Sequence, residues 1–174
     1  VFSEDMCNKL VEFTNKNAKN RLVVGDGQNV QAYEGEIFSD DPFFKPISSK
    51  LIDIGRFLAC KYHITFGNYN EYNHEGITIR KIYGPTQLHT DGPTYDMVNG
   101  NMMVSVDQIR SVSVIIALNG DYDGGEIVFP CQNFKTKLKQ GEAIAFPPHW
   151  THPHYTEDLK NNTFRYTINT WLTL

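Results

Sequence analysis

Two histidines and one aspartate, the second histidine far along the chain from the other two, are the residue types that could hold a divalent metal ion. His89 and Asp91 are separated by one residue, so in an extended segment both side chains point to the same face and can touch one ion. In a later histidine-rich segment, His152 and His154 share a face in the same way, and alternation does not choose between them. Two imidazoles and one carboxylate cover one face of Fe(II) and leave the other open, as in non-haem iron sites that use oxygen.

Arg165 is the residue type that such a site needs if its co-substrate is an anion. Its planar guanidinium can hold a carboxylate through two parallel hydrogen bonds and stays charged when partly buried. On the strand expected there, alternation places three more residues on the same side: Thr167, Asn169 and Trp171. A solvated face is the plainer explanation of these residues taken alone. The metal hypothesis therefore requires a fold that brings this strand to the histidines.

The first third of the chain has helical spacing. Ser3 precedes acidic residues and an apolar pattern that continues to about Asn17, which predicts one helix before the glycines of 25–27. A second helix is predicted from about Pro42 to Tyr62, with apolar residues every three or four positions.

Beyond residue 64 the pattern changes to short β-branched and aromatic runs separated by Gly, Pro, Asn and Asp. Strands are expected near 64–69, 76–84, 87–91, 111–119, 125–129, 134–138, 143–147, 152–156 and 164–172. Many short strands favour a sandwich or barrel, and the preceding helices make the fold class α+β, with the helices bracing one face of the sheet.

Two connections stand out between these expected strands. The polar stretch 92–110 is long and follows His89 and Asp91 directly, so we expect a lid that closes over the metal. Gly124 and Gly125 predict a turn that needs positive φ, and we interpret the adjacent Glu126 as structural rather than as a further ligand.

Composition limits the classes of function. With 174 residues, 40% hydrophobic residues and a net charge of −4, the chain has the size of one globular domain and no basic surface for nucleic acid or anionic membrane. Its three cysteines show no CxxC spacing, which favours a reducing compartment, the cytoplasm. We see no leader-like start and no apolar run long enough to span a bilayer, so neither nucleic acid nor membrane is expected as a partner.

Several short motifs occur in an order that resembles the prolyl 4-hydroxylase group of iron(II)- and 2-oxoglutarate-dependent dioxygenases. They are Tyr83-Gly84, His89-x-Asp91, Ser113 to Asn119, Asp123 to Pro130, Gly141 to Pro147, and His154 followed by Arg165-Tyr166. The resemblance covers about residues 75–174. It implies a double-stranded β-helix (jelly roll) over about 64–174, braced by helical support over about 1–63, in a single domain of residues 1–174.

The resemblance also implies roles for individual residues. His89, Asp91 and His154 would bind the iron, because His154 stands eleven residues before Arg165, closer to the family's usual spacing than His152. Arg165 would bind the far carboxylate of 2-oxoglutarate, where collagen-type enzymes usually carry lysine. The hydroxyls of Tyr83 and Ser113 match positions that assist that carboxylate.

By the same resemblance the cofactors are Fe(II), 2-oxoglutarate and O₂, with ascorbate as a candidate reductant, and the products include succinate and CO₂. The expected substrate is a prolyl residue in a peptide or protein. Two other functions stay open at this point: hydroxylation of a free amino acid or small metabolite, and a non-catalytic jelly-roll binding module. The sequence leaves the oligomeric state undetermined.

Overall fold

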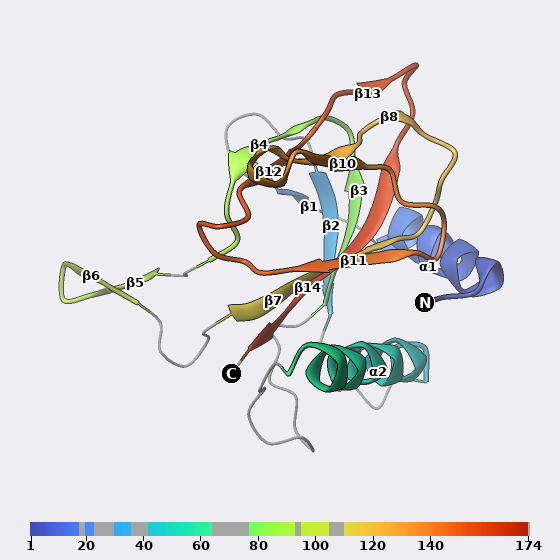
Figure 1. The fold of residues 1–174 in the computed structure, drawn as a ribbon. Coiled ribbons are helices and arrows are strands. Elements are labelled where there is room, and N and C mark those ends of the chain that lie inside the picture. The colour runs from blue at the N-terminus through green and yellow to red at the C-terminus, as the bar shows by residue number, and fades with distance from the viewer. Residues whose placement is uncertain are drawn as a thin grey trace.

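Two amino-terminal helices pack against a large antiparallel sheet (Figure 1). The computed structural model describes residues 1–17, 20–22, 30–35, 42–63, 77–92, 95–104 and 110–173.

Helix α1 (Glu4–Asn17) begins after Ser3, whose hydroxyl accepts a hydrogen bond from the Met6 amide at 3.3 Å. Helix α2 (Lys45–Tyr62) has Pro46 in its first turn and ends at His63, which has a left-handed conformation. Both predicted helices are confirmed, and 42–44 form a turn before the second one.

The large sheet has six strands, all antiparallel to their neighbours. Their order is β1 (Asn20–Leu22), β2 (Val30–Gly35), β3 (Ile77–Ile82), β14 (Arg165–Thr173), β7 (Arg110–Ala117) and β11 (Ala143–Phe146). Strands β1 and β2 were not predicted, so the segment before residue 64 supplies strands as well as helices. These two strands are short, and β2 is held by its pairing with β3, a contact across more than forty residues that local periodicity does not reveal.

A second antiparallel sheet of four strands carries the histidines. Its order is β10 (Phe134–Thr136), β9 (Ile127–Phe129), β12 (His154–Thr156) and β4 (Thr86–His89). Two further pairs complete the described strands: β8 (Asp123–Gly124) with β13 (Leu159–Lys160), and β5 (Tyr95–Val98) with β6 (Asn101–Val104). A short 3₁₀ turn, η2, covers Pro130–Gln132. The strands predicted from 76 onward are found with bounds that differ by one or two residues, and the one predicted at 64–69 lies outside the described residues.

Two apolar clusters define the layers. The larger lies between the helices and the large sheet and contains Leu10, Ile47, Leu51, Ile79, Val114 and Ile168 among others. The smaller lies between the two sheets and contains Ala117, Ile127, Phe129, Leu138 and Phe146. In Figure 1, α2 accordingly lies on one side of the large sheet, and β4, β10 and β12 lie on the other. No helix in the described ranges is both long and apolar enough to cross a membrane.

The stretch predicted as an irregular lid contains a β-hairpin. β5 and β6 pair from Tyr95 with Val104 to Val98 with Asn101, and Figure 1 shows them extending away from the two sheets. Asn99 and Gly100, the two residues of the turn, both have positive φ, of 52° and 78°. Asn-Gly is the preferred pair for a two-residue hairpin turn, so the sequence did contain the signal. The expectation of an irregular loop is wrong over 95–104.

The glycine turn before β9 is confirmed. Gly124 and Gly125 have φ values of 70° and 68°, a region that other residues rarely adopt. A Cβ atom on Gly125 would lie 2.8 Å from the Leu159 side chain and 3.3 Å from the Tyr122 ring. The turn therefore requires glycine both for its dihedral angles and for space.

We expect Ile168→Ala to lower the free energy of unfolding by about 2–5 kcal/mol, because it leaves a cavity in the middle of the core. Ile168 is fully buried on β14 and pairs with Ile79 and Ile116. Urea unfolding measures the change. Leu88→Ala is the control, because that side chain is 60% exposed and its loss should change stability by less than about 1 kcal/mol. Equal losses in the two variants would contradict the assignment of the core.

Candidate metal and co-substrate site

Pairing of β4 with β12 brings the predicted metal ligands together. His89 and His154 are register partners across these antiparallel strands, and Asp91 follows two residues after the end of β4. The imidazole rings of His89 and His154 lie 4.4 Å apart between centroids. His154 is buried and packs against the rings of Phe129 and Phe146, at 5.5 and 4.7 Å. His154 is thus held by its strand pairing and by two adjacent phenylalanine rings, which lie 4.9 Å apart.

The three side chains offer ligand atoms at distances that suit one ion. Nε2 of His89 lies 3.4 Å from Oδ1 of Asp91, and Nε2 of His154 lies 3.8 Å from Oδ2. All three ligand atoms fall within 4.8 Å of one another. A metal about 2.1 Å from each ligand, with right angles between them, would need separations of about 3 Å, so small side-chain shifts would complete the coordination.

Backbone contacts present the Nε2 atoms of both histidines. Nδ1 of His89 lies 2.7 Å from the carbonyl of Gln87, and Nδ1 of His154 lies 3.2 Å from the carbonyl of His152. Because a carbonyl only accepts hydrogen bonds, these contacts require the proton on Nδ1. In the neutral ring the lone pair is then on Nε2, on the side of Asp91, where a metal ion can bind it. In the metal-free protein a protonated His89 donates from Nε2 to Asp91, and a metal ion would replace that proton. His152 therefore orients His154 through its backbone, and its own side chain is not part of the cluster.

Several donors keep Asp91 ionised. Burial by itself raises the pKa of this carboxyl group, but hydrogen bonds from His89, Ser113 and Trp171 outweigh it and hold the pKa well below its usual range. The Ser113 hydroxyl donates to Oδ2 at 2.5 Å, and the Arg110 guanidinium donates to the Asp91 carbonyl. The hydrogen bond between His89 and Asp91 also raises the pKa of His89. Burial lowers the pKa of His154.

Arg165 lies in the same cavity as these three residues. The cavity is lined by residues of both sheets, among them Arg80, Ile115, Thr167, Asn169 and Trp171. The side chains that alternation placed beside Arg165 thus face this cavity rather than solvent. Arg165 is buried and donates to the carbonyl of Gly125 at 2.8 Å, and its Nε has no acceptor among the described residues. Burial lowers the pKa of Arg165 to about 10, so the group remains charged at neutral pH.

A buried guanidinium with an unsatisfied Nε fits an anionic ligand. Within the described part of the chain, Asp91 supplies the one carboxylate that lines the cavity, and it already accepts from His89 and Ser113. The residues present therefore fit both groups that the ligand set implies: a divalent metal at the histidine end and a carboxylate at Arg165. The cavity volume is about 40 Å³, so a bound dicarboxylate would have to push its lining side chains apart.

Two of the predicted co-substrate residues lie elsewhere. Ser113 contacts Asp91 and not Arg165, so its hydroxyl supports the metal end. Tyr83 does not line the cavity; its ring packs edge-on against Phe164 at 5.0 Å, with the Lys81 ammonium 5.6 Å from the ring. The alternation of β3 explains this: Arg80 and Ile82 face the cavity, and Lys81 and Tyr83 face the other way.

Sequence reasoning missed Arg80 and the contact of Trp171 with Asp91. Arg80 shares its face of β3 with the buried Ile82, and a charged residue at such a position was the available signal. Alternation placed Trp171 on the same side of its strand as Arg165 but gave no sign of its hydrogen bond to Asp91. Glu126 belongs neither to the metal cluster nor to the lining of this cavity.

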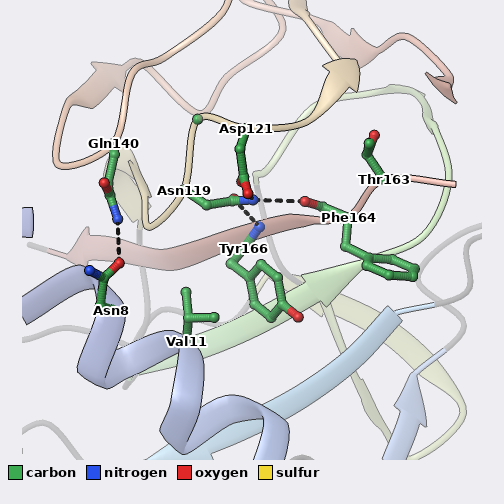
Figure 2. Close-up of a pocket in the computed structure, with 9 residues that line it drawn as sticks. Asn8, Val11, Asn119, Asp121, Gln140, Thr163, Phe164 and Tyr166 are labelled. Carbon is green, nitrogen blue, oxygen red and sulfur yellow. Dashed lines mark hydrogen bonds between the residues drawn. The ribbon is translucent and has the colours of Figure 1, made fainter. Parts of the chain in front are cut away.

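A larger hollow of about 700 Å³ lies between α1 and the opposite face of β14 (Figure 2). Its polar side chains already satisfy one another. The Asn119 amide donates to Asp121 at 2.7 Å and to the Phe164 carbonyl at 2.8 Å, and Gln140 donates to Asn8 at 2.9 Å. The contact between Gln140 and Asn8 joins α1 to the segment before β11, and the hollow contains none of the metal-binding cluster.

Comparisons with known proteins agree with this site. Residues 80–173, more than half of the chain, match the family model of the 2OG-Fe(II) oxygenase superfamily. The chain therefore belongs to the 2OG-Fe(II) oxygenase superfamily, whose cofactors are iron(II) and 2-oxoglutarate. A search of curated proteins found no match.

Solved structures show the same fold at low sequence identity. A viral collagen prolyl hydroxylase from Paramecium bursaria Chlorella virus-1, in complex with 2-oxoglutarate, is 20% identical with a TM-score of 0.67, over 99% of this chain and 90% of that one. A Pseudomonas putida prolyl-4-hydroxylase is 14% identical with a TM-score of 0.66, over 99% and 88%. A Trichoplax adhaerens prolyl hydroxylase, in complex with a hypoxia inducible factor peptide fragment, is 15% identical with a TM-score of 0.66, over 98% and 77%.

We expect His154→Ala and His152→Ala to differ sharply in metal affinity. Loss of a ligand atom should weaken binding of Mn(II), a redox-inert substitute for Fe(II), by more than about a hundredfold. Loss of the His152 side chain, which leaves its backbone carbonyl in place, should weaken it by less than about tenfold. Calorimetric titration with Mn(II) measures both. A larger loss of metal affinity in His152→Ala than in His154→Ala would show that His152, and not His154, is the ligand.

The stability of the metal-free protein should fall in acid because of Asp91. The pKa of Asp91 is lower in the folded protein than the unfolded value of about 3.9. The ionised carboxylate therefore adds to the free energy of unfolding above that pH, and this contribution is lost as the pH falls below it. We expect the free energy of unfolding to drop less steeply from about pH 5 to about pH 2 in Asp91→Asn than in the unaltered protein. Asp53→Asn, at an exposed position on α2, is the control and should keep the original slope. Parallel curves for the unaltered protein and Asp91→Asn would contradict this account of the carboxylate.

Proposed function

We propose that this protein is a hydroxylase in which His89, Asp91 and His154 hold Fe(II) and Arg165 holds the far carboxylate of 2-oxoglutarate. One observation carries the proposal: three ligand atoms converge in a narrow cavity that also contains a buried guanidinium. The family match supports the cofactors. The two antiparallel sheets with a shared apolar cluster between them support a jelly roll, within one domain that includes both helices.

The residues of the chain prepare the site before any substrate arrives. Asp91 remains a carboxylate because Ser113, Trp171 and a protonated His89 hydrogen bond to it, and metal binding would release the His89 proton. Both histidines then present Nε2 to the ion because their Nδ1 atoms donate to backbone carbonyls. These three ligands leave the rest of the coordination sphere open for co-substrate and oxygen. Apolar residues Ile82, Ile115 and Ile127 line the cavity and exclude water from it.

Bound iron and 2-oxoglutarate supply oxidative decarboxylation: one oxygen atom of O₂ goes into succinate, with release of CO₂, and the other goes into a C–H bond of the substrate as hydroxyl. The role of Arg165 in that chemistry is to fix one end of 2-oxoglutarate. A charge-assisted hydrogen bond contributes about 1.5–3 kcal/mol. Arg165→Gln should therefore weaken co-substrate binding and leave the metal in place.

For the substrate, we propose a prolyl residue in a peptide or protein. The support is the fold shared with three proteins that are described as prolyl hydroxylases, one of them in complex with a peptide fragment. His89 is partly exposed, so the metal site is open on one side to a substrate outside the cavity.

The test is iron-dependent production of succinate from 2-oxoglutarate by the purified protein, with a panel of proline-containing peptides and with free proline. We expect turnover with at least one peptide and a mass gain of one oxygen on it. Asp91→Ala should abolish both signals, and Arg56→Gln, a charge change on the exposed side of α2, should leave them unchanged. Turnover with free proline alone would show that the substrate is a small molecule rather than a peptide or protein. No succinate under any condition would favour a binding module and contradict the proposal.

A further inference from the structure

Arg80 places a second guanidinium in the cavity. It lies on β3, where it pairs with Thr167 of β14, two residues along the strand from Arg165. Its side chain lines the cavity together with His89, Asp91 and Arg165. The two arginines are close enough for like-charge repulsion: after burial and the opposing effect of Tyr122, Arg80 is a further cause of the lowered pKa of Arg165. Both cations therefore act in the same enclosed space.

The two guanidinium groups are directed to different ends of that space. Arg165 donates to the carbonyl of Gly125, in the turn before β9. The Arg80 guanidinium lies 5.9 Å from the centre of the Trp171 ring, and Trp171 hydrogen bonds to Asp91. Arg165 and Trp171 are six residues apart on β14, about 20 Å at 3.3 Å per residue. Arg80 therefore reaches toward the metal end of the cavity, away from the Gly125 carbonyl that Arg165 contacts.

The charges in the cavity favour a ligand with two negative groups. Among the described lining residues there are two guanidinium groups and one carboxylate, and a divalent ion would add further positive charge. In a narrow, largely apolar enclosure, guanidinium groups interact strongly with an anionic group that enters. The cavity is narrow, with a volume of about 40 Å³, and Arg80 lines it together with the metal ligands and Arg165. A ligand that extends from the metal ligands to Arg165 therefore passes beside Arg80.

We propose that Arg80 binds the carboxylate at the oxo-acid end of 2-oxoglutarate, next to the metal, so that an arginine holds each end of the co-substrate. The inference rests on the proposed function, which assigns the far carboxylate to Arg165. Arg80 then selects 2-oxo acids at the metal end, and Arg165 selects for the second carboxylate. Trp171 supports both Asp91 and the Arg80 guanidinium that lies over its ring.

The test compares two acids that differ at one end. 2-Oxovalerate has the oxo-acid group of 2-oxoglutarate and lacks the far carboxylate. The Mn(II)-loaded protein is titrated with each acid by calorimetry, which requires no turnover. The variants are Arg80→Gln, Arg80→Lys and Arg165→Gln, and Arg56→Gln makes the same chemical change at an exposed position on α2.

We expect Arg80→Gln to weaken binding of both acids by about tenfold to a hundredfold, the range for a charge-assisted hydrogen bond. Arg165→Gln should weaken binding of 2-oxoglutarate by a similar factor and leave 2-oxovalerate unchanged, and Arg56→Gln should change neither. If Arg80→Gln does not fold, Arg80→Lys decides, because lysine keeps the charge but loses the two parallel bonds. It should weaken binding of both acids, by less than the glutamine variant would.

Two results would overturn the inference and leave the proposed function in place. One is unchanged affinity for both acids in the folded Arg80 variants. The other is a loss confined to 2-oxoglutarate, which would place Arg80 at the far carboxylate. Failure of the unaltered protein to bind 2-oxoglutarate would instead remove the proposed function, and the inference with it.

Discussion

The Asp91 carboxylate is the constraint on which the rest of the site depends. It lies just past the end of β4, and its partners come from other parts of the fold: Ser113 from β7, Trp171 from β14 and His154 from β12. A buried carboxylate without such partners would be protonated and could not bind a cation. Both sheets must therefore be in register before the metal site exists, which makes correct folding a condition for metal binding.

Strand β14 connects the stability of the fold to the chemistry of the site. One of its faces packs Tyr166, Ile168 and Leu172 into the core beneath the helices. The other face presents Arg165, Asn169 and Trp171 to the cavity. Because side chains alternate, a shift of one residue would exchange these faces, so burial of the apolar face fixes the direction of Arg165. The apolar core thus determines where the co-substrate charge is placed.

Local patterns in the sequence predicted much of the fold and most of the site. Helical spacing located both helices, and the single-residue separation of His89 and Asp91 predicted their common face. Choosing His154 over His152 required the family spacing to Arg165, because alternation treats the two alike. The hairpin at 95–104 was available from Asn99-Gly100 and was overlooked. Two features depend on which strands become neighbours, and no local pattern contains that information: the pairing of β2 with β3 and the contact of Ser113 with Asp91. The position of Tyr83 outside the cavity follows from alternation along β3 once the cavity-facing side of that strand is known.

The most direct test of the central claim is a crystal structure of the protein with Mn(II) and 2-oxoglutarate, with the metal located by anomalous scattering. The account predicts one strong peak within about 2.3 Å of Nε2 of His89, an Asp91 carboxylate oxygen and Nε2 of His154, with 2-oxoglutarate extending from it to the Arg165 guanidinium. A peak bound by other side chains, or 2-oxoglutarate that does not reach Arg165, would contradict it.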